Sequence, residues 1–159
     1  MTDNLEQYRG YPEVAFPAGH IFITEGQHSG HLYILVEGAV EVFRGETSIA
    51  FVSDPGAIFG EMSLLLGIPP TASVKTMTPV RMRMIDDALR ELEETPALLV
   101  PIARLLARRL QSSTTYLVDL KRQFSQHSDH FAMVDEVLES LMHQQAHRFT
   151  RDDELPASP

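Results

Sequence analysis

The sequence of 159 residues contains no cysteine. This absence excludes a disulfide scaffold, a thiol nucleophile and any zinc site built on thiolates. The sequence also has no apolar run approaching the roughly 20 residues of a membrane-spanning helix, and its polar N-terminus lacks the apolar core of a signal peptide. Hydrophobic residues make up 43% of the chain, which is ordinary for a globular protein. We therefore expect a cytoplasmic protein with one hydrophobic core and no contact with membranes.

Basic residues are scarce as well, since 13 Lys and Arg stand against 22 Asp and Glu, a net charge of −9. Affinity for nucleic acid depends largely on neutralising phosphates, so this balance disfavours a protein dedicated to DNA or RNA. The charge is also uneven, with −8 over residues 1–96, +4 over residues 97–126 and −5 over residues 127–159. A basic segment between two acidic ones suggests a chain that pairs with itself or with a second copy.

Short antiparallel strands are predicted between residues 14 and 85, where segments rich in Val, Ile, Phe and Tyr are separated by Gly and Pro turns. Arg44-Gly45-Glu46 is typical of a hairpin turn. From Val80 to Met84 apolar and basic side chains alternate strictly, so we expect Arg81 and Arg83 on a solvated face. The predicted strands are 14–16, 20–24, 32–36, 39–43, 48–52, 71–76 and 80–85.

A long helix is predicted over residues 95–126, with Thr95 as its N-cap and Pro96 at its first position. Apolar residues recur there at spacings of three and four, which indicates a coiled-coil-like seam. Such a helix beside a small β domain usually packs against its own copy, so a homodimer is expected; alternatively, the stripe covers the β domain. The seam consists of Ile102, Leu106, Leu110, Ser113, Leu117, Leu120 and Phe124.

The last segment, residues 127–159, is expected to hold a short amphipathic helix over residues 131–141 and an acidic flexible tail. His143 and His147 are four residues apart, but the intervening Gln-Gln-Ala lacks a catalytic glutamate, and surface histidines are favoured over a metal site. No Ser-His-Asp arrangement, glycine-rich fingerprint or paired-carboxylate motif stands out. We therefore predict neither an enzyme nor a bound cofactor.

The most informative segment runs over residues 59–74, where a glycine opens a short helix with a carboxylate at its N-terminus, followed by a Pro-Pro break. Exposed N–H groups at a helix N-terminus beside a glycine are typical of an anion site. Glu61 would there accept a hydrogen bond from a ligand hydroxyl, or alternatively only stabilise the helix through its dipole. The candidate ligand-binding residues are Phe59, Gly60, Glu61, Met62, Ser63, Pro70, Thr71, Ala72 and Ser73.

Phe59-Gly60-Glu61-Met62-Ser63-Leu64 resembles the phosphate-binding cassette of cyclic nucleotide-binding domains, as in catabolite activator and Fnr-like regulators, protein kinase A regulatory subunits and cyclic nucleotide-gated channels. The resemblance covers about residues 14–124 and includes the glycines at turn positions 19, 26, 38 and 56. It implies a mainly β fold, an antiparallel, jelly-roll-like double-stranded β-roll over residues 1–94. A hinge helix near residues 87–93 and a long C-helix over 95–126, which dimerises in bacterial regulators, would follow.

The resemblance also implies that Glu61 holds the ribose hydroxyl, and that N–H groups of Met62, Ser63, Ala72 and Ser73 face the phosphate. Thr71 stands where some members contact cyclic GMP. The family has an arginine that pairs with the phosphate where this chain has Pro70, which offers neither charge nor donor.

Weak or atypical binding of cyclic AMP or cyclic GMP is therefore expected. Lys75 is some 13 Å along the strand from Thr71. Arg44, Arg81 or Arg83 would replace the missing charge only if the fold brings it to the cassette.

The function implied is a stand-alone sensory module that signals through the geometry of its dimer helices. Alternatives are a degenerate, ligand-free β-roll that binds a protein partner, and a regulator that heterodimerises with full-length relatives. Transcription factors of this family carry a helix-turn-helix domain after the C-helix, whereas residues 127–159 have a charge of −5. We therefore expect no direct DNA binding.

Overall fold

The computed structural model describes residues 3–124 and 132–149 of the chain. They divide into two compact units, Met1–Ala103 and Arg104–Pro159. Leu98 and Ile102, which belong to the first unit, are buried. Among the described residues, no helix is long and apolar enough to cross a membrane.

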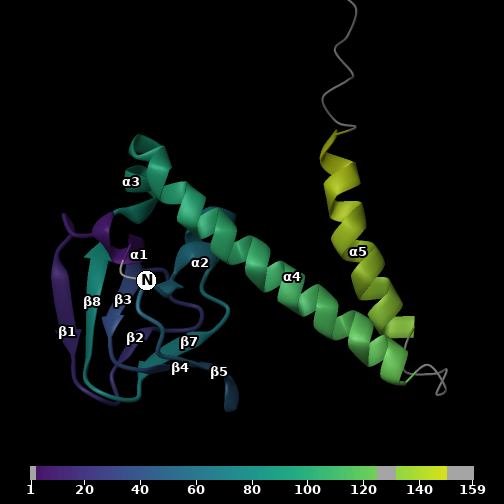
Figure 1. Ribbon diagram of the computed structural model, residues 1–159, viewed down its shortest axis with the longest axis horizontal. Coiled ribbons are helices and arrows are strands. Elements are labelled where there is room, and N and C mark those ends of the chain that lie inside the picture. Colours follow the sequence, from purple (N-terminus) through teal and green to yellow (C-terminus); the bar gives the residue numbers. More distant parts are fainter. Residues whose placement is uncertain (1–2, 125–131, 150–159) are drawn as a thin grey trace, which may run out of the picture. The chain divides into compact units, whose positions relative to one another are not determined.

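The first unit is built around eight short strands, which Figure 1 shows together with the helices α2 and α3. Its elements are α1 (Asp3–Glu6), β1 (Glu13–Phe16), β2 (Ile21–Ile23), β3 (Leu32–Glu37), β4 (Val40–Arg44), β5 (Thr47–Val52), β6 (Ile58–Phe59), α2 (Glu61–Leu66), β7 (Ser73–Thr76), β8 (Val80–Ile85), α3 (Ala88–Glu94) and a 3-10 turn, η1 (Pro96–Leu98).

The strands form two four-stranded sheets, in the orders β1-β8-β3-β6 and β2-β7-β4-β5, and every pair is antiparallel. Apolar side chains from both sheets fill the space between them, which is the sandwich solution for sheets with one apolar face. The predicted β-roll is thus confirmed. The core cluster consists of Phe22, Ile23, Tyr33, Leu35, Val40, Phe59, Val74, Val80 and Met82.

The neighbouring strands β4 and β7 fix which side chains face this core. Val40 lies opposite Thr76, and Val42 lies opposite Val74. Val40, Val74 and Thr76 are all buried. Because successive side chains on a strand point to opposite faces, the alternate positions carry the other face of the sheet.

Two strand predictions need correction. The two-residue strand β6 (Ile58–Phe59) is too short to show an alternation and was not among the predicted strands. The strand predicted from residue 71 begins only at Ser73, because the carbonyl groups of Pro70 and Thr71 bond to other segments instead of a sheet ladder. The predicted hairpin turn is confirmed, with Arg44 paired to Thr47 across Gly45 and Glu46.

The predicted hinge helix is confirmed as α3, and a 3-10 turn (η1) separates it from the long helix α4 (Leu99–Gln123). Thr95 precedes that turn, but its side chain makes no capping bond. Its hydroxyl donates instead to Glu91 at 3.3 Å. The prediction that the Thr95 side chain caps the helix is therefore wrong, although Pro96 is the first residue of the turn as predicted.

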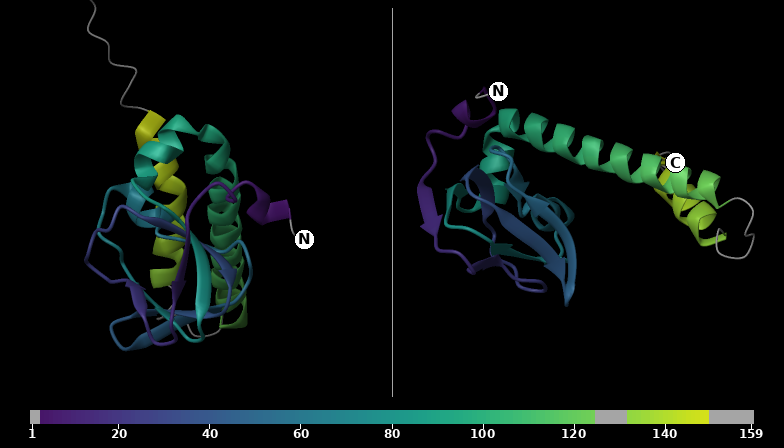
Figure 2. Two further views of the ribbon diagram at one scale, coloured as in Figure 1. Left: turned by 90° about the vertical axis from the view of Figure 1, so that its left-hand side faces the viewer. Right: turned by 60° about the horizontal axis from the view of Figure 1, so that its bottom comes forward.

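The helix α4 is one continuous helix of 25 residues (Figure 2). Ile102, the first residue of the predicted seam, is 1% exposed and belongs to the core of the first unit, so it is already covered by its own chain. The seam residues Leu110 and Phe124 are among the exposed large apolar side chains.

In the second unit, α5 (Ala132–Phe149) is longer than the predicted helix, and Lys121 of α4 pairs with Asp135 of α5. The tail predicted after residue 150 lies outside the described residues.

A half-buried tyrosine joins the segment before β1 to α3. Tyr11 Oη donates a hydrogen bond to Glu91 Oε1 at 2.6 Å. Burial, then this bond, then the charge of Glu91 raise the pKa of Tyr11 from 10.0 to about 12. The unfolded chain releases this proton at lower pH than the folded protein, so the contribution to stability is complete below pH 10 and is lost between about pH 10 and 12.

We expect Tyr11→Phe to lower the free energy of unfolding at pH 8 by about 1 kcal/mol, because it removes this hydrogen bond. The variant should also show a smaller decline in stability above pH 10. Urea unfolding at pH 8, 10 and 11 measures both effects. Tyr116→Phe, at an exposed position of α4, is the matched control and should change neither. The same pH profile for both variants would contradict this role of Tyr11.

Candidate functional site

Gly60 joins β6 to α2 in a left-handed backbone conformation, with φ 98° and ψ −8°. A Cβ atom at this position would lie 2.7 Å from the carbonyl oxygen of His31. Two properties of this position therefore require glycine: the positive φ and the close approach of the neighbouring segment. This tight turn directs the chain from the sheet straight into the predicted cassette helix.

Glu61, the first residue of α2, is only 3% exposed. Carboxylates are rarely this buried in proteins unless they have polar partners, and buried titratable groups gather at functional sites. A glutamate that only stabilised a helix dipole would gain the same benefit while remaining in water. The burial of Glu61 thus favours the ligand-binding interpretation over the dipole interpretation.

Local hydrogen bonds stabilise the C-terminal end of α2. The helix has six residues and ends at Gly67, whose φ of 64° is left-handed and whose N–H donates to the carbonyl of Ser63. Ser63 Oγ donates to the carbonyl of Ile68 at 2.7 Å. The hydroxyl of Ser63 is therefore used to hold the end of the helix, whereas the side chain of Met62 is exposed.

The loop between α2 and β7 contains Pro70, the position of the missing arginine. Its carbonyl oxygen accepts a hydrogen bond from the N–H of Gly26 at 2.8 Å. The next carbonyl, that of Thr71, accepts a hydrogen bond from Nε of Arg44 at 2.7 Å. Two separate segments, the loop after β2 and the end of β4, thus hold this loop by its carbonyl groups.

A third bond fixes the end of the loop, because the N–H of Glu25 donates to Ser73 Oγ at 2.9 Å. Ser73 lies opposite Phe43 in the sheet, so its side chain shares the face of Phe43 rather than the core-facing side. Among the described residues, the N–H groups of Thr71 and Ala72 donate no hydrogen bond to the protein. The structure therefore leaves available the N–H of Ala72, which belongs to the predicted cradle, and the adjacent N–H of Thr71, which was not predicted as part of it.

The two halves of the cassette meet around β2. Ile23 pairs with Val74 in the sheet, and its Cδ1 lies 3.8 Å from the Cβ position of Gly60. Phe59, which ends β6, is buried in the core and makes an edge-on contact with Phe22. The predicted residues 59–63 and 70–73 are thus joined to one sheet strand, although they are separated in sequence.

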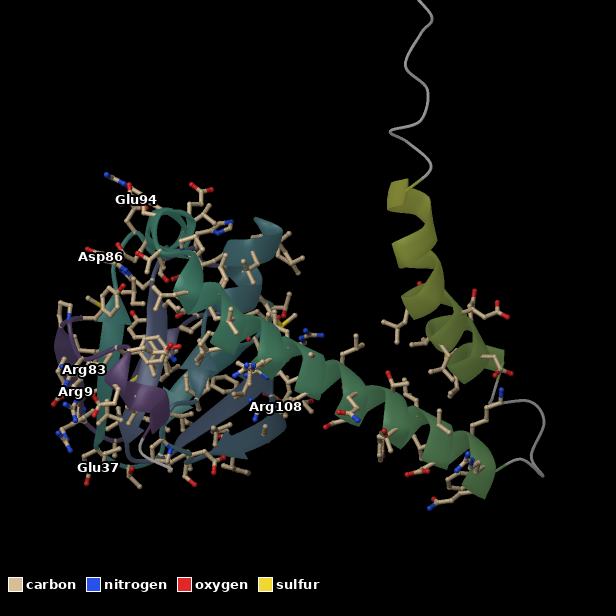
Figure 3. The ribbon with its side chains drawn as sticks, turned by 45° about the horizontal axis from the view of Figure 1, so that its top comes forward. Arg9, Glu37, Arg83, Asp86, Glu94 and Arg108 are labelled. Atoms are coloured by element: carbon tan, nitrogen blue, oxygen red, sulfur yellow. The ribbon has the colours of Figure 1, made fainter. Side chains whose placement is uncertain are left out.

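Two of the basic residues considered as replacements lie elsewhere. Arg81 donates hydrogen bonds to Glu37 and Glu13, and Arg83 pairs with Glu13 and donates to the carbonyl of Tyr11. Figure 3 shows Arg83 and Glu37 at the side of the roll that carries β1 and β8. Arg81 is solvated as predicted, whereas Arg83 is partly buried.

The cassette also lies next to the start of the hinge helix. His31, whose carbonyl lies against Gly60, has its Nδ1 2.8 Å from the carboxylate of Asp86. Its neighbour Gly30 accepts a hydrogen bond from the N–H of Ala88, the first residue of α3, at 3.0 Å. One short segment therefore contacts both the cassette glycine and the helix α3. Sequence reasoning named Gly26 only as a turn glycine and gave Glu25, Gly30 and His31 no role at the site.

Comparison with known proteins agrees with this geometry. The family model of the cyclic nucleotide-binding domain matches residues 13–95, about half of the chain. A CRP-like cAMP-activated global transcriptional regulator of Mycobacterium tuberculosis is 36% identical over 113 residues, which are 67% of this chain and 50% of the relative. The chain thus spans about half the length of that relative.

Solved structures also resemble the chain. The N-terminal domain of a transcriptional regulator from Streptomyces coelicolor matches with a TM-score of 0.53 and 27% identity, over 73% of this chain and 85% of that chain. The catabolite activator protein of Thermus thermophilus shares the fold, with a TM-score of 0.59 at 21% identity over 100% and 88% of the two chains. By its sequence match and its two-sheet roll with a glycine-glutamate cassette, this chain belongs to the cyclic nucleotide-binding domain family.

Proposed function

We propose that this chain is a regulatory module that binds a cyclic nucleotide, cyclic AMP or cyclic GMP, in the cassette of residues 59–63 and 70–73. The observation that carries the proposal is the burial of Glu61 directly after the left-handed Gly60. A buried carboxylate at the head of the cassette is a ready acceptor for ribose hydroxyl groups, which each need a hydrogen-bond partner once water is excluded.

The phosphate of the ligand would lie near the loop of residues 70–72. The free N–H groups of Thr71 and Ala72 are donors of the kind that bind anions when they lie next to one another. The cAMP-activated relative supports cyclic AMP as the first ligand to test. We propose no catalytic role, because these groups hold a ligand without offering a nucleophile or a base poised against it.

The signal would pass from the cassette to α3 and then to α4. Gly30 and His31 contact both the cassette glycine and the start of α3, so a ligand that moves Gly60 also displaces the segment that holds α3. The exposed apolar residues Leu110 and Tyr116 on α4, and Phe124 directly after it, support a homodimer through this helix. The proposed output is a change in the geometry of that dimer.

Isothermal calorimetry with cyclic AMP and cyclic GMP up to millimolar concentration tests the proposal. We expect binding of at least one of them, and we expect Glu61→Gln to weaken it by about 10- to 100-fold, because an ionised acceptor is worth about 1.5–3 kcal/mol in a hydrogen bond. Glu94→Gln, which removes an exposed carboxylate paired with Arg90 on α3, is the control and should bind like the wild type.

No heat and no thermal shift with either nucleotide would overturn the proposed ligands. Equal binding by Glu61→Gln and Glu94→Gln would instead contradict the role given to Glu61. Sedimentation velocity with and without the nucleotide then reports whether the chain is a dimer and whether the ligand changes its shape.

A further inference from the structure

One basic side chain of the roll has a charge that no carboxylate of the described residues neutralises. Residues 13–95 contain five Lys and Arg: Arg44, Lys75, Arg81, Arg83 and Arg90. Four of them form ion pairs with glutamates, whereas Arg44 forms none within the part of the chain that the structure describes. In a unit as acidic as this one, an unpaired guanidinium needs an explanation.

The register of the sheet places Arg44 on the core-facing side of the roll. Val42 lies opposite Val74, and Phe43 lies opposite Ser73, where the pairing of the two strands ends. Alternate residues of a strand share a face, so Arg44, the last residue of β4, shares the face of Val42, which packs against the core together with Val74. It therefore emerges at the end of that face, beside the cassette loop.

Pro70 lies in the cassette loop, and β7 begins only at Ser73. Pro70 offers no charge to this loop, but the guanidinium of Arg44 lies beside the loop, because its Nε is 2.7 Å from the carbonyl oxygen of Thr71. An arginine from β4 thus reaches the place that the loop itself leaves without a cation.

The hydrogen bond to Thr71 also leaves Arg44 with most of its donors. A guanidinium has five N–H donors, and the bond from Nε uses one of them. The two terminal nitrogens make no contact with an acceptor among the described residues. These nitrogens form the fork that binds phosphate oxygens in pairs. The bond to Thr71 orients that fork before any ligand arrives.

We propose that Arg44 supplies the positive charge for the phosphate of the bound cyclic nucleotide, in place of an arginine at position 70. This inference rests on the proposed function. It assigns the phosphate contact to the end of β4, so that the cassette loop contributes N–H groups and the neighbouring strand contributes the cation.

The carboxylate of Glu25 at the hairpin turn does not cancel this charge. Glu25 Oε2 accepts a hydrogen bond from the N–H of Gly45 at 3.2 Å, which holds it at the hairpin turn beside Arg44 without an ion pair between them. Lys75, the other basic residue on these strands, lies on the opposite face. It pairs with Glu41 at 3.5 Å and stands 5.4 Å from the centre of the Phe43 ring.

Calorimetric titration of the full chain with cyclic AMP and cyclic GMP, in four single variants and one double variant, tests the proposal. Arg44→Gln keeps a donor for the carbonyl of Thr71 but has no charge, and we expect it to weaken binding by about 10- to 100-fold. Arg44→Lys keeps the charge and should stay within about tenfold of the wild type. Lys75→Gln removes one charge from the other face of the same strands and should change the affinity less than twofold.

The fourth variant restores the charge from the loop. We expect Pro70→Arg to recover most of the lost affinity when it is added to Arg44→Gln, and to gain much less in the wild-type background. Such non-additivity is the signature of two groups that serve one interaction. The melting temperature of each variant shows that the fold is retained.

Each result has a distinct meaning. Full affinity in Arg44→Gln overturns the inference and leaves the proposed function intact. Equal losses in Arg44→Gln and Arg44→Lys, with no recovery by Pro70→Arg, also overturn it, because Arg44 would then only position the loop. Absence of binding by the wild type to either nucleotide defeats the proposed function itself, and the inference with it.

Discussion

Gly60→Ala is expected to lower the free energy of unfolding by about 2–4 kcal/mol. Two independent costs add at this residue. An alanine would have to hold φ near 98°, a conformation that L-residues rarely adopt. Its Cβ would also lie 2.7 Å from the carbonyl oxygen of His31, which is backbone and cannot rotate away. The 30–31 segment would have to move, together with its bond to α3.

Comparing the urea unfolding of Gly60→Ala with that of Gly67→Ala separates the cost of the positive φ from the cost of the contact with His31. Gly67 also has a positive φ, of 64°, but nothing lies within 4 Å of its Cβ position. We expect Gly67→Ala to cost about 1 kcal/mol, from backbone strain alone. Equal losses of stability in the two variants would contradict the contact between Gly60 and His31.

Thr76→Val is expected to cost about 2–3 kcal/mol, although it preserves the shape of the side chain. Thr76 is fully buried on β7, and its hydroxyl donates to the carbonyl of Pro17 at 2.6 Å and accepts from the N–H of His20 at 2.8 Å. Valine would leave both groups of the turn between β1 and β2 without this partner. Each unpaired, partly buried group costs about 1–3 kcal/mol.

Thr76→Ser is the matched variant, because it keeps the hydroxyl and removes only a methyl group. It should retain most of the stability that Thr76→Val loses. Thr47→Val, at an exposed position of β5, should change the free energy of unfolding by less than about 0.5 kcal/mol. If Thr76→Ser were the less stable of the two, packing rather than hydrogen bonding would govern this position.

Local patterns in the sequence predicted the features that depend on neighbouring residues. The alternation of Val80 to Met84 predicted β8, and the turn at Gly45 predicted the β4–β5 hairpin. Gly60 and Glu61 stand out because a glycine and a carboxylate precede a short apolar helix. In each case the signal lies within a few residues, where periodicity and turn chemistry act.

The contacts that complete the site depend on sheet register, which the sequence does not display. Arg44 and Thr71 are 27 residues apart, and only the pairing of β4 with β7 brings them together. The burial of Ile102 similarly follows from packing within the first unit, since Leu110, which belongs to the same predicted seam, is exposed. Strand β6 has two residues, fewer than any alternation needs.

The short segment of Gly30 and His31 contacts both the cassette glycine and the start of α3, so in the proposed function it would couple ligand binding to the position of that helix. Binding free energies coupled in this way are reciprocal. If a cyclic nucleotide changes the affinity of α4 for its partner by some factor, then that partner changes the affinity for the nucleotide by the same factor. Under the proposed function, the nucleotide affinity of the isolated chain would then differ from that of the assembled protein, and the ratio of the two affinities would measure the strength of the signal.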